Sequence, residues 1–178
     1  MRIIGGSLKG RRFEAPLLKN TRPTTDFAKT GLYNILTNNF DFTEVTFLDL
    51  FSGTGAHSLE FASRGAIRVV SVDADYTCVS FLTKMKTEWK LDNLQPLKAD
   101  VFKFINSCTE SFDVIFAGPP YALPEIDEMP SLIFEKKLLK KDGWFILETS
   151  PLHNFDNHPN FLRKRNYGST FFHIFVVK

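Results

Sequence analysis

The chain has 178 residues, of which 43% are hydrophobic, and a formal net charge of +2. This length suffices for one well-buried domain and is too short for two ordinary ones. No apolar run approaches the roughly 18 to 20 residues of a membrane span, and the N-terminus lacks a signal-peptide core, so we expect a soluble, cytoplasmic protein. Cys78 and Cys108 show neither a disulfide framework nor a zinc-ligand spacing, so no metal site is predicted.

Positive charge gathers at the N-terminus. Residues 1–25 contain six Lys or Arg and one acid, whereas the rest of the chain contains sixteen Lys or Arg and nineteen acids. The basic residues are Arg2, Lys9, Arg11, Arg12, Lys19 and Arg22. Glycines and short apolar pairs separate them, which predicts a small basic β extension that presents cations to a phosphate backbone. A solvated basic arm is the alternative.

From residue 26 onward, short apolar runs alternate with segments of helical periodicity. This pattern predicts a doubly wound α/β domain with a mostly parallel, seven-stranded sheet. A first helix is expected over 26–36, with Thr24, Thr25 or Asp26 as its cap. The next strands are expected at 45–50, 67–72, 95–99, 112–117 and 143–149, and helices near 56–64, 75–90, 100–108 and 130–140. Apolar and polar residues alternate with a period of two on both sides of Gly168. This pattern predicts a C-terminal antiparallel hairpin formed by residues 160–165 and 171–177.

The segment Leu48-Asp-Leu-Phe-Ser-Gly-Thr-Gly55 is typical of a buried strand that enters a glycine turn. In an open parallel sheet, the ligand binds beyond the carboxyl ends of the strands. Gly53 and Gly55 allow a tight turn and a close approach of the backbone, and the following helix points its positive end at a carboxylate. Asp49, just before the turn, can accept hydrogen bonds from an ammonium group or a water.

Two further acids follow the next predicted strands. Asp73 is placed to accept both ribose hydroxyls, and Asp100 to accept from an adenine amine while Phe102 or Phe116 packs on the ring. Each acid alone could be a helix cap, but three at successive strand ends favour a nucleoside with a charged tail, such as S-adenosylmethionine (SAM). The predicted cofactor site comprises Asp49, Phe51, Gly53, Thr54, Gly55, Asp73, Ala74, Asp100, Val101 and Phe116.

Other nucleotide sites fit the glycine turn less well. Gly53-x-Gly55-x-x-Ser58 is a degraded form of the dinucleotide fingerprint, so NAD binding is the weaker alternative. No Gly-Lys-Ser/Thr follows the turn, which argues against a P-loop.

A second motif, Gly118-Pro119-Pro120-Tyr121, follows the fourth predicted strand. Two prolines stiffen a turn and expose carbonyls that have no local N–H partner. The carbonyls of Gly118 and Pro119 can draw the hydrogens of an exocyclic base amine out of plane, while Tyr121 stacks on the base. These four residues are the predicted catalytic, target-base site. A proline-rich turn without function is the alternative.

Four stretches together resemble a known family. They are Arg2-Ile-Ile-Gly-Gly6 with Lys9-Gly-Arg-Arg12, Thr21-Arg-Pro-Thr-Thr-Asp26 with Leu32-Tyr-Asn-Ile-Leu36, Leu48 to Gly55, and Pro119-Pro-Tyr121. In content, order and spacing they are similar to bacterial methyltransferases that modify a guanine N2 amine in 16S ribosomal RNA. The resemblance implies a class I, Rossmann-like fold and SAM as cofactor. It also implies that the partner is small-subunit ribosomal RNA or an assembling small subunit. The protein is expected to be a monomer.

The resemblance also implies roles for the N-terminal residues. Arg2, Lys9, Arg11, Arg12 and Arg22 are expected to contact RNA, with residues 22–26 lying over the pocket. Residues 1–25 then form the RNA-binding extension and 26–178 the catalytic core of one domain.

One residue departs from the family pattern, which has Asp or Asn where this chain has Gly118. Loss of a charge-assisted hydrogen bond costs roughly 1.5 to 3 kcal/mol, or about 10- to 150-fold in rate, so reduced activity is expected. A smaller departure is Thr30, where the family usually has an acid. Glu148, at the end of the fifth predicted strand, is assigned no role, and the four histidines are predicted to be ordinary polar or packing residues. The alternatives are a catalytically impaired protein that binds SAM and RNA during ribosome assembly, and a DNA adenine-N6 methyltransferase.

Overall fold

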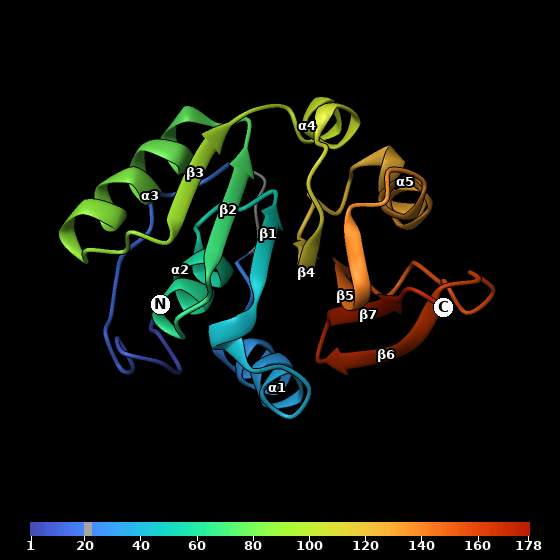
Figure 1. Cartoon of the computed structure of the whole chain (residues 1–178), viewed down its shortest axis with the longest axis horizontal. Helices are drawn as coiled ribbons and strands as arrows, with labels where there is room; N and C mark the ends of the chain where they lie inside the picture. Colours follow the sequence, from blue (N-terminus) through green and yellow to red (C-terminus); the bar gives the residue numbers. More distant parts are fainter. Residues whose placement is uncertain (20–22) are drawn as a thin grey trace.

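A seven-stranded mixed sheet with the order β3-β2-β1-β4-β5-β7-β6 organises the chain (Figure 1). The structure is a computed structural model that describes residues 1–19 and 23–178, so Arg22 lies outside the described residues. The strands are β1 (Thr46–Leu50), β2 (Arg68–Asp73), β3 (Leu94–Lys98), β4 (Phe112–Ala117), β5 (Leu139–Thr149), β6 (Phe161–Tyr167) and β7 (Thr170–Val176). The helices are α1 (Asp26–Thr37), α2 (Ala56–Ser63), α3 (Tyr76–Glu88), α4 (Val101–Ser107) and α5 (Met129–Glu135), with 3₁₀ turns at Phe42–Glu44 and Pro124–Glu128.

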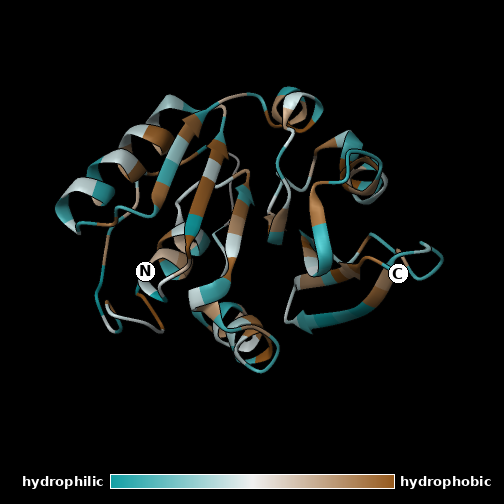
Figure 2. Ribbon diagram, in the orientation of Figure 1, coloured by the Kyte–Doolittle hydropathy of each residue, from teal (hydrophilic) through white to brown (hydrophobic). Residues whose placement is uncertain are grey.

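The sheet confirms the predicted α/β architecture. Strands β1 to β5 pair in parallel, whereas β7 runs antiparallel between β5 and β6 as the predicted hairpin. The central strands are apolar because both of their faces are covered. The edge strand β6 is more hydrophilic, as its teal colour in Figure 2 shows, and its charged side chains oppose pairing with a further strand.

Helices cover both faces of the sheet. One core contains apolar residues of α1, α2 and α3, and the other contains those of α4 and α5. Thr25 caps α1 by accepting from the Ala28 N–H at 3.2 Å, one of the three predicted caps. Within the part of the chain that the structure describes, no helix is long and apolar enough to cross a bilayer.

The predicted strand pair at the N-terminus is shorter than expected. Arg2 and Arg12 form an isolated antiparallel bridge, flanked by hydrogen bonds from Ile3 N to Arg11 O and from Phe13 N to Met1 O. Positive φ angles at Gly6 and Gly10 turn the intervening segment back on itself. Arg2, Lys9, Arg11 and Arg12 therefore lie on a compact turn and not on a regular ladder.

The predicted boundary between the last helix and the fifth strand was also wrong. Helix α5 ends at Glu135 instead of residue 140, and β5 already begins at Leu139. The left-handed conformations of Lys137 and Asp142 explain both errors, because they end the helix and bend the strand within a polar stretch that resembles a loop. Gly143 follows this bend, and a Cβ there would lie 2.6 Å from the Asp113 carbonyl oxygen.

A buried carboxylate fastens the N-terminal segment to the domain. Glu60 on α2 accepts from the backbone N–H of Ile4 at 2.9 Å and of Gly5 at 2.7 Å. Its side chain is fully buried, with Arg64 Nε at 3.0 Å and the Lys29 ammonium, on α1, at 3.6 Å. Removal of one partner of such a buried cluster leaves the other charges without compensation.

Substitution Glu60→Gln is therefore expected to lower the free energy of unfolding by about 3 to 5 kcal/mol, and to expose the amides of residues 3–5 to hydrogen exchange. Chemical denaturation and exchange mass spectrometry measure the two effects. The control is Glu110→Gln, which removes a half-exposed carboxylate paired with Arg68 and should cost less than about 1 kcal/mol. Equal costs for the two variants would contradict the assigned role of Glu60.

Candidate active site

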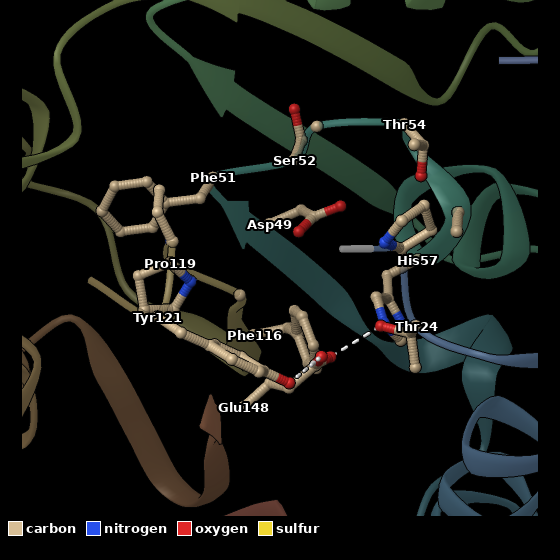
Figure 3. A pocket seen from close by; sticks show the side chains of 15 residues that line it. Thr24, Asp49, Phe51, Ser52, Thr54, His57, Phe116, Pro119, Tyr121 and Glu148 are labelled. Carbon is tan, nitrogen blue, oxygen red and sulfur yellow. Dashed lines mark hydrogen bonds between the residues drawn. The ribbon is translucent and has the colours of Figure 1, made fainter. Parts of the chain in front are cut away.

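A cavity of about 270 Å³ opens at the carboxyl ends of β1, β4 and β5 (Figure 3). The strand order reverses between β1 and β4, which are neighbours in the sheet. Open α/β sheets bind ligands at such a switch point. The cavity is lined by Pro23, Thr24, Asp49, Phe51, Ser52, Gly53, Thr54, Ala56, His57, Phe116, Gly118, Pro119, Pro120, Tyr121 and Glu148. The two predicted motifs thus meet in one pocket.

The glycine turn forms one wall. Gly53 and Gly55 have φ angles of 50° and 73°, which favour glycine. Gly55 also needs to be glycine for packing, because a Cβ there would lie 2.2 Å from the Leu82 side chain on α3. The turn ends directly at α2, whose first residues, Ala56 and His57, line the pocket and whose N-terminus has no side-chain cap.

Asp49 lies buried at the floor of the pocket, at 1% exposure. Its carboxylate accepts from the Ser58 hydroxyl at 2.5 Å, and Ser58 in turn accepts from Ser71 at 2.6 Å. Burial, together with the nearby carboxylates of Asp73 and Glu148, raises the pKa of Asp49 to about 7 in spite of the Ser58 hydrogen bond. A cation bound in the pocket would therefore be stabilised by the ionised form of Asp49.

Five predicted cofactor residues, Gly55 among them, do not line the cavity. Asp73 accepts from Gly53 N at 2.8 Å and from Asp75 N at 2.9 Å, so it supports the glycine turn from behind. Asp100 caps α4 through Lys103 N at 2.9 Å, and Val101 is buried in the core beneath it. Ala74 is exposed in the turn after β2. Their roles in holding a cofactor stay predictions.

The residues of the cavity fit the charged end of SAM. The molecule carries an ammonium group, a sulfonium and a carboxylate. Asp49 offers a buried acceptor to a cation, and the turn before α2 offers backbone N–H groups to an anion. Phe51 adds an apolar wall, and its ring lies 6.3 Å from that of Phe102.

The Gly118-Pro119-Pro120-Tyr121 turn forms the opposite wall. Gly118 N donates to Leu50 O at 3.2 Å, which fixes the start of the turn against β1. A Cβ on Gly118 would meet only the edge of the Phe116 ring, at 3.1 Å, so a side chain here requires a small shift of that ring. Phe116 packs against His57, with 3.9 Å between ring centroids. Its ring therefore lies between the two motifs and lines the pocket.

A chain of hydrogen bonds that the sequence did not predict crosses the pocket. Glu148, 4% exposed, accepts from the Thr24 hydroxyl at 2.6 Å and from the Tyr121 hydroxyl at 3.3 Å. The His57 Nε2 lies 3.1 Å from the Thr24 hydroxyl, and its Nδ1 lies 3.1 Å from the Tyr33 hydroxyl. Burial lowers the pKa of His57 to about 3, so the imidazole is neutral.

The number of available hydrogens fixes the direction of each of these hydrogen bonds. Thr24 has one hydroxyl hydrogen, which it donates to Glu148, so it accepts from His57 Nε2–H. The His57 Nδ1 then accepts from Tyr33. His57 was predicted to be an ordinary polar residue and Glu148 was assigned no role. Their places at a helix start and at a strand end, both at the ligand-binding edge, were the available signal.

Four of the predicted RNA-binding residues lie within the part of the chain that the structure describes, and none of these four lines the pocket. Arg2 forms an ion pair with Asp26 at 3.2 Å, two residues beyond Thr24. Arg11 stacks over the Trp89 ring at 4.7 Å, and Lys9 and Arg12 are exposed. Contact of these residues with RNA stays a prediction. Among residues 1–19 and 23–178, no group of three or more His, Cys, Asp or Glu side chains is arranged to hold a metal ion.

Comparison with known proteins places the chain among ribosomal RNA methyltransferases. It is 32% identical over 152 residues to YlbH of Bacillus subtilis, a protein named provisionally as an rRNA methyltransferase; the match covers 83% of this chain and 82% of YlbH. It is 30% identical over 161 residues to ribosomal RNA small subunit methyltransferase D of Haemophilus influenzae, covering 84% and 78% of the two chains.

The fold is also shared with solved structures. A hypothetical protein of Thermus thermophilus superposes with a TM-score of 0.87 at 26% identity, over 99% of both chains. The sequence matches a protein family over residues 1–176, nearly its whole length. The chain therefore belongs to the family described as Conserved hypothetical protein 95.

Proposed function

We propose that this chain transfers a methyl group from SAM to the exocyclic N2 amine of a guanine in small-subunit ribosomal RNA. One observation carries the proposal: a buried acid with a glycine turn and a proline-stiffened turn with an aromatic side chain face each other across one cavity. The names of the relatives, rRNA methyltransferases that include the small-subunit enzyme D, support the same activity and the substrate class.

The chemistry requires orientation and electrostatics and no covalent intermediate. An amine nitrogen attacks the sulfonium methyl group in line, so the two reactants must lie on opposite sides of the transferred carbon. The glycine turn and the Gly118-Pro119-Pro120-Tyr121 turn are the two walls that hold them. Tyr121 supplies a ring on which a base swung out of its helix can stack. A monomeric state and a cytoplasmic location belong to this proposal as predictions.

The first test measures transfer of labelled methyl from SAM to unmodified small ribosomal subunits, for this chain and its Gly118→Asp variant. We expect label in the ribosomal RNA with the parent chain, and N2-methylguanosine after nucleoside digestion. The variant should be at least as fast, because it adds a side-chain acceptor. Transfer by the variant alone would favour the binding-only assembly protein, and preference for duplex DNA would favour the adenine methyltransferase.

The pKa of Asp49 predicts a pH-dependent affinity for SAM. A bound cation favours the ionised carboxylate, so affinity should rise roughly five- to tenfold between about pH 6 and pH 7.5, with release of a proton on binding. Asp49→Asn should weaken binding and remove this rise, whereas Asp142→Asn, a surface control outside the pocket, should keep it. Calorimetry in two buffers of different ionisation enthalpy measures both quantities. A pH-independent affinity in the parent chain would remove Asp49 from the cation site.

Charge reversal tests the basic extension. Arg11→Glu with Arg12→Glu should weaken RNA binding. The slope of log K against log salt concentration should become shallower by about one to two, because fewer phosphate contacts form and fewer counterions are released. The matched control reverses two exposed lysines on another part of the surface, Lys136→Glu with Lys141→Glu. If both pairs change the slope equally, the basic extension is a solvated arm and not an RNA footprint.

A further inference from the structure

We infer that Glu148 is the side-chain acceptor for the target amine, an inference that rests on the proposed function and assigns this residue a catalytic contact. An exocyclic base amine needs an acceptor for its hydrogens as it attacks, and residue 118 contributes only its backbone. Among the described lining residues, the carboxylates are Asp49 and Glu148. Asp49 lies on the cofactor side, bonded to Ser58.

Strand register places Glu148 beside the proline turn. In the parallel pairing of β4 with β5, Ala117 lies level with Leu147, so residues 118 and 148 follow at the same level on neighbouring strands. Neighbouring strands lie about 4.8 Å apart. A carboxylate on residue 148 can thus reach the space that a side chain on Gly118 would occupy, and both residues line the cavity. Figure 3 shows Glu148 beside Tyr121 of the proline turn.

The hydrogen bonds that Glu148 accepts from Thr24 and Tyr121 suit this role. Thr24 holds one carboxylate oxygen at 2.6 Å and fixes the rotamer. The bond from Tyr121 to the other oxygen is long, at 3.3 Å, and therefore weak. An incoming amine can take the place of the tyrosine hydroxyl on this oxygen, which leaves the Tyr121 ring to stack on the base. A hydrogen bond to a charged acceptor is about twice as strong as a neutral one.

Atoms and charges balance in the transfer. The nitrogen lone pair forms the new N–C bond while the C–S bond breaks and its electron pair goes to sulfur, which leaves a neutral thioether. The nitrogen then carries a positive charge and loses one proton to the Glu148 carboxylate, which passes it to solvent after release. Glu148 thus stabilises charge that develops on the amine in the transition state.

A positioning role is the competing explanation, because Glu148 also ties Thr24 and Tyr121 together. A double-mutant cycle separates the two roles. Glu148→Gln keeps the size and an acceptor oxygen but loses the charge and the proton-accepting capacity. In the parent chain it should lower kcat at least tenfold, with SAM affinity by calorimetry changed less than threefold. In the Gly118→Asp background, where a second carboxylate is available, the same substitution should lower kcat less than threefold.

The outcomes are distinct. Equal losses in both backgrounds would make Glu148 a positioning residue and overturn the inference, as would an unchanged kcat in the parent chain. Absence of transfer by the parent and by Gly118→Asp alike would overturn the proposed function itself, and the inference with it. If Glu148→Gln does not fold, Glu148→Asp provides the same cycle: it keeps the charge, withdraws it by one methylene, and should again be rescued by Gly118→Asp.

Discussion

The buried carboxylate of Glu60 is the contact on which the shape of the pocket depends. It lies on α2, the helix that begins at the glycine turn, and it binds the backbone of Ile4 and Gly5. The Lys29 ammonium of α1 lies 3.6 Å from it and donates to the Arg2 carbonyl at 2.7 Å. Since α1 is preceded by residues of the pocket wall, one charge fixes the N-terminal segment, the first helix and the cofactor turn relative to one another.

The fold was predictable because its signals are local and repeated. Buried runs such as 112–117 and the helical periods between them specify a parallel sheet without knowledge of any contact. Errors occurred where local chemistry and tertiary structure disagree. Residues 140–142 are polar enough to resemble a loop, but they lie within β5 at the irregularity of register between the Leu139–Phe112 and Trp144–Val114 pairs. The basic turn at the N-terminus makes one bridge where a strand pair was expected.

The cavity lining was predictable where it carries local signals in the sequence, Asp49 at a strand end among them. Gly55 and the proline turn are required by local conformation, so they appear in the sequence as motifs. Thr24, His57 and Glu148 are separated by up to 124 positions and meet only in the folded chain. Conversely, the rule that acids end strands at the ligand edge also selected Asp100, whose carboxylate caps a helix and lies outside the cavity lining.

His57 takes part in the hydrogen bonds across the pocket as a neutral imidazole. A neutral His57 donates from Nε2 and accepts at Nδ1, so every hydrogen bond from Tyr33 to Glu148 points toward the carboxylate. Such alignment of dipoles favours negative charge at its end. Protonation of His57 would turn Nδ1 from an acceptor into a donor and reverse the hydrogen bond with Tyr33, and burial opposes this by lowering the pKa of His57. Burial thus makes His57 a poor base and leaves it as a neutral link between Tyr33 and Thr24.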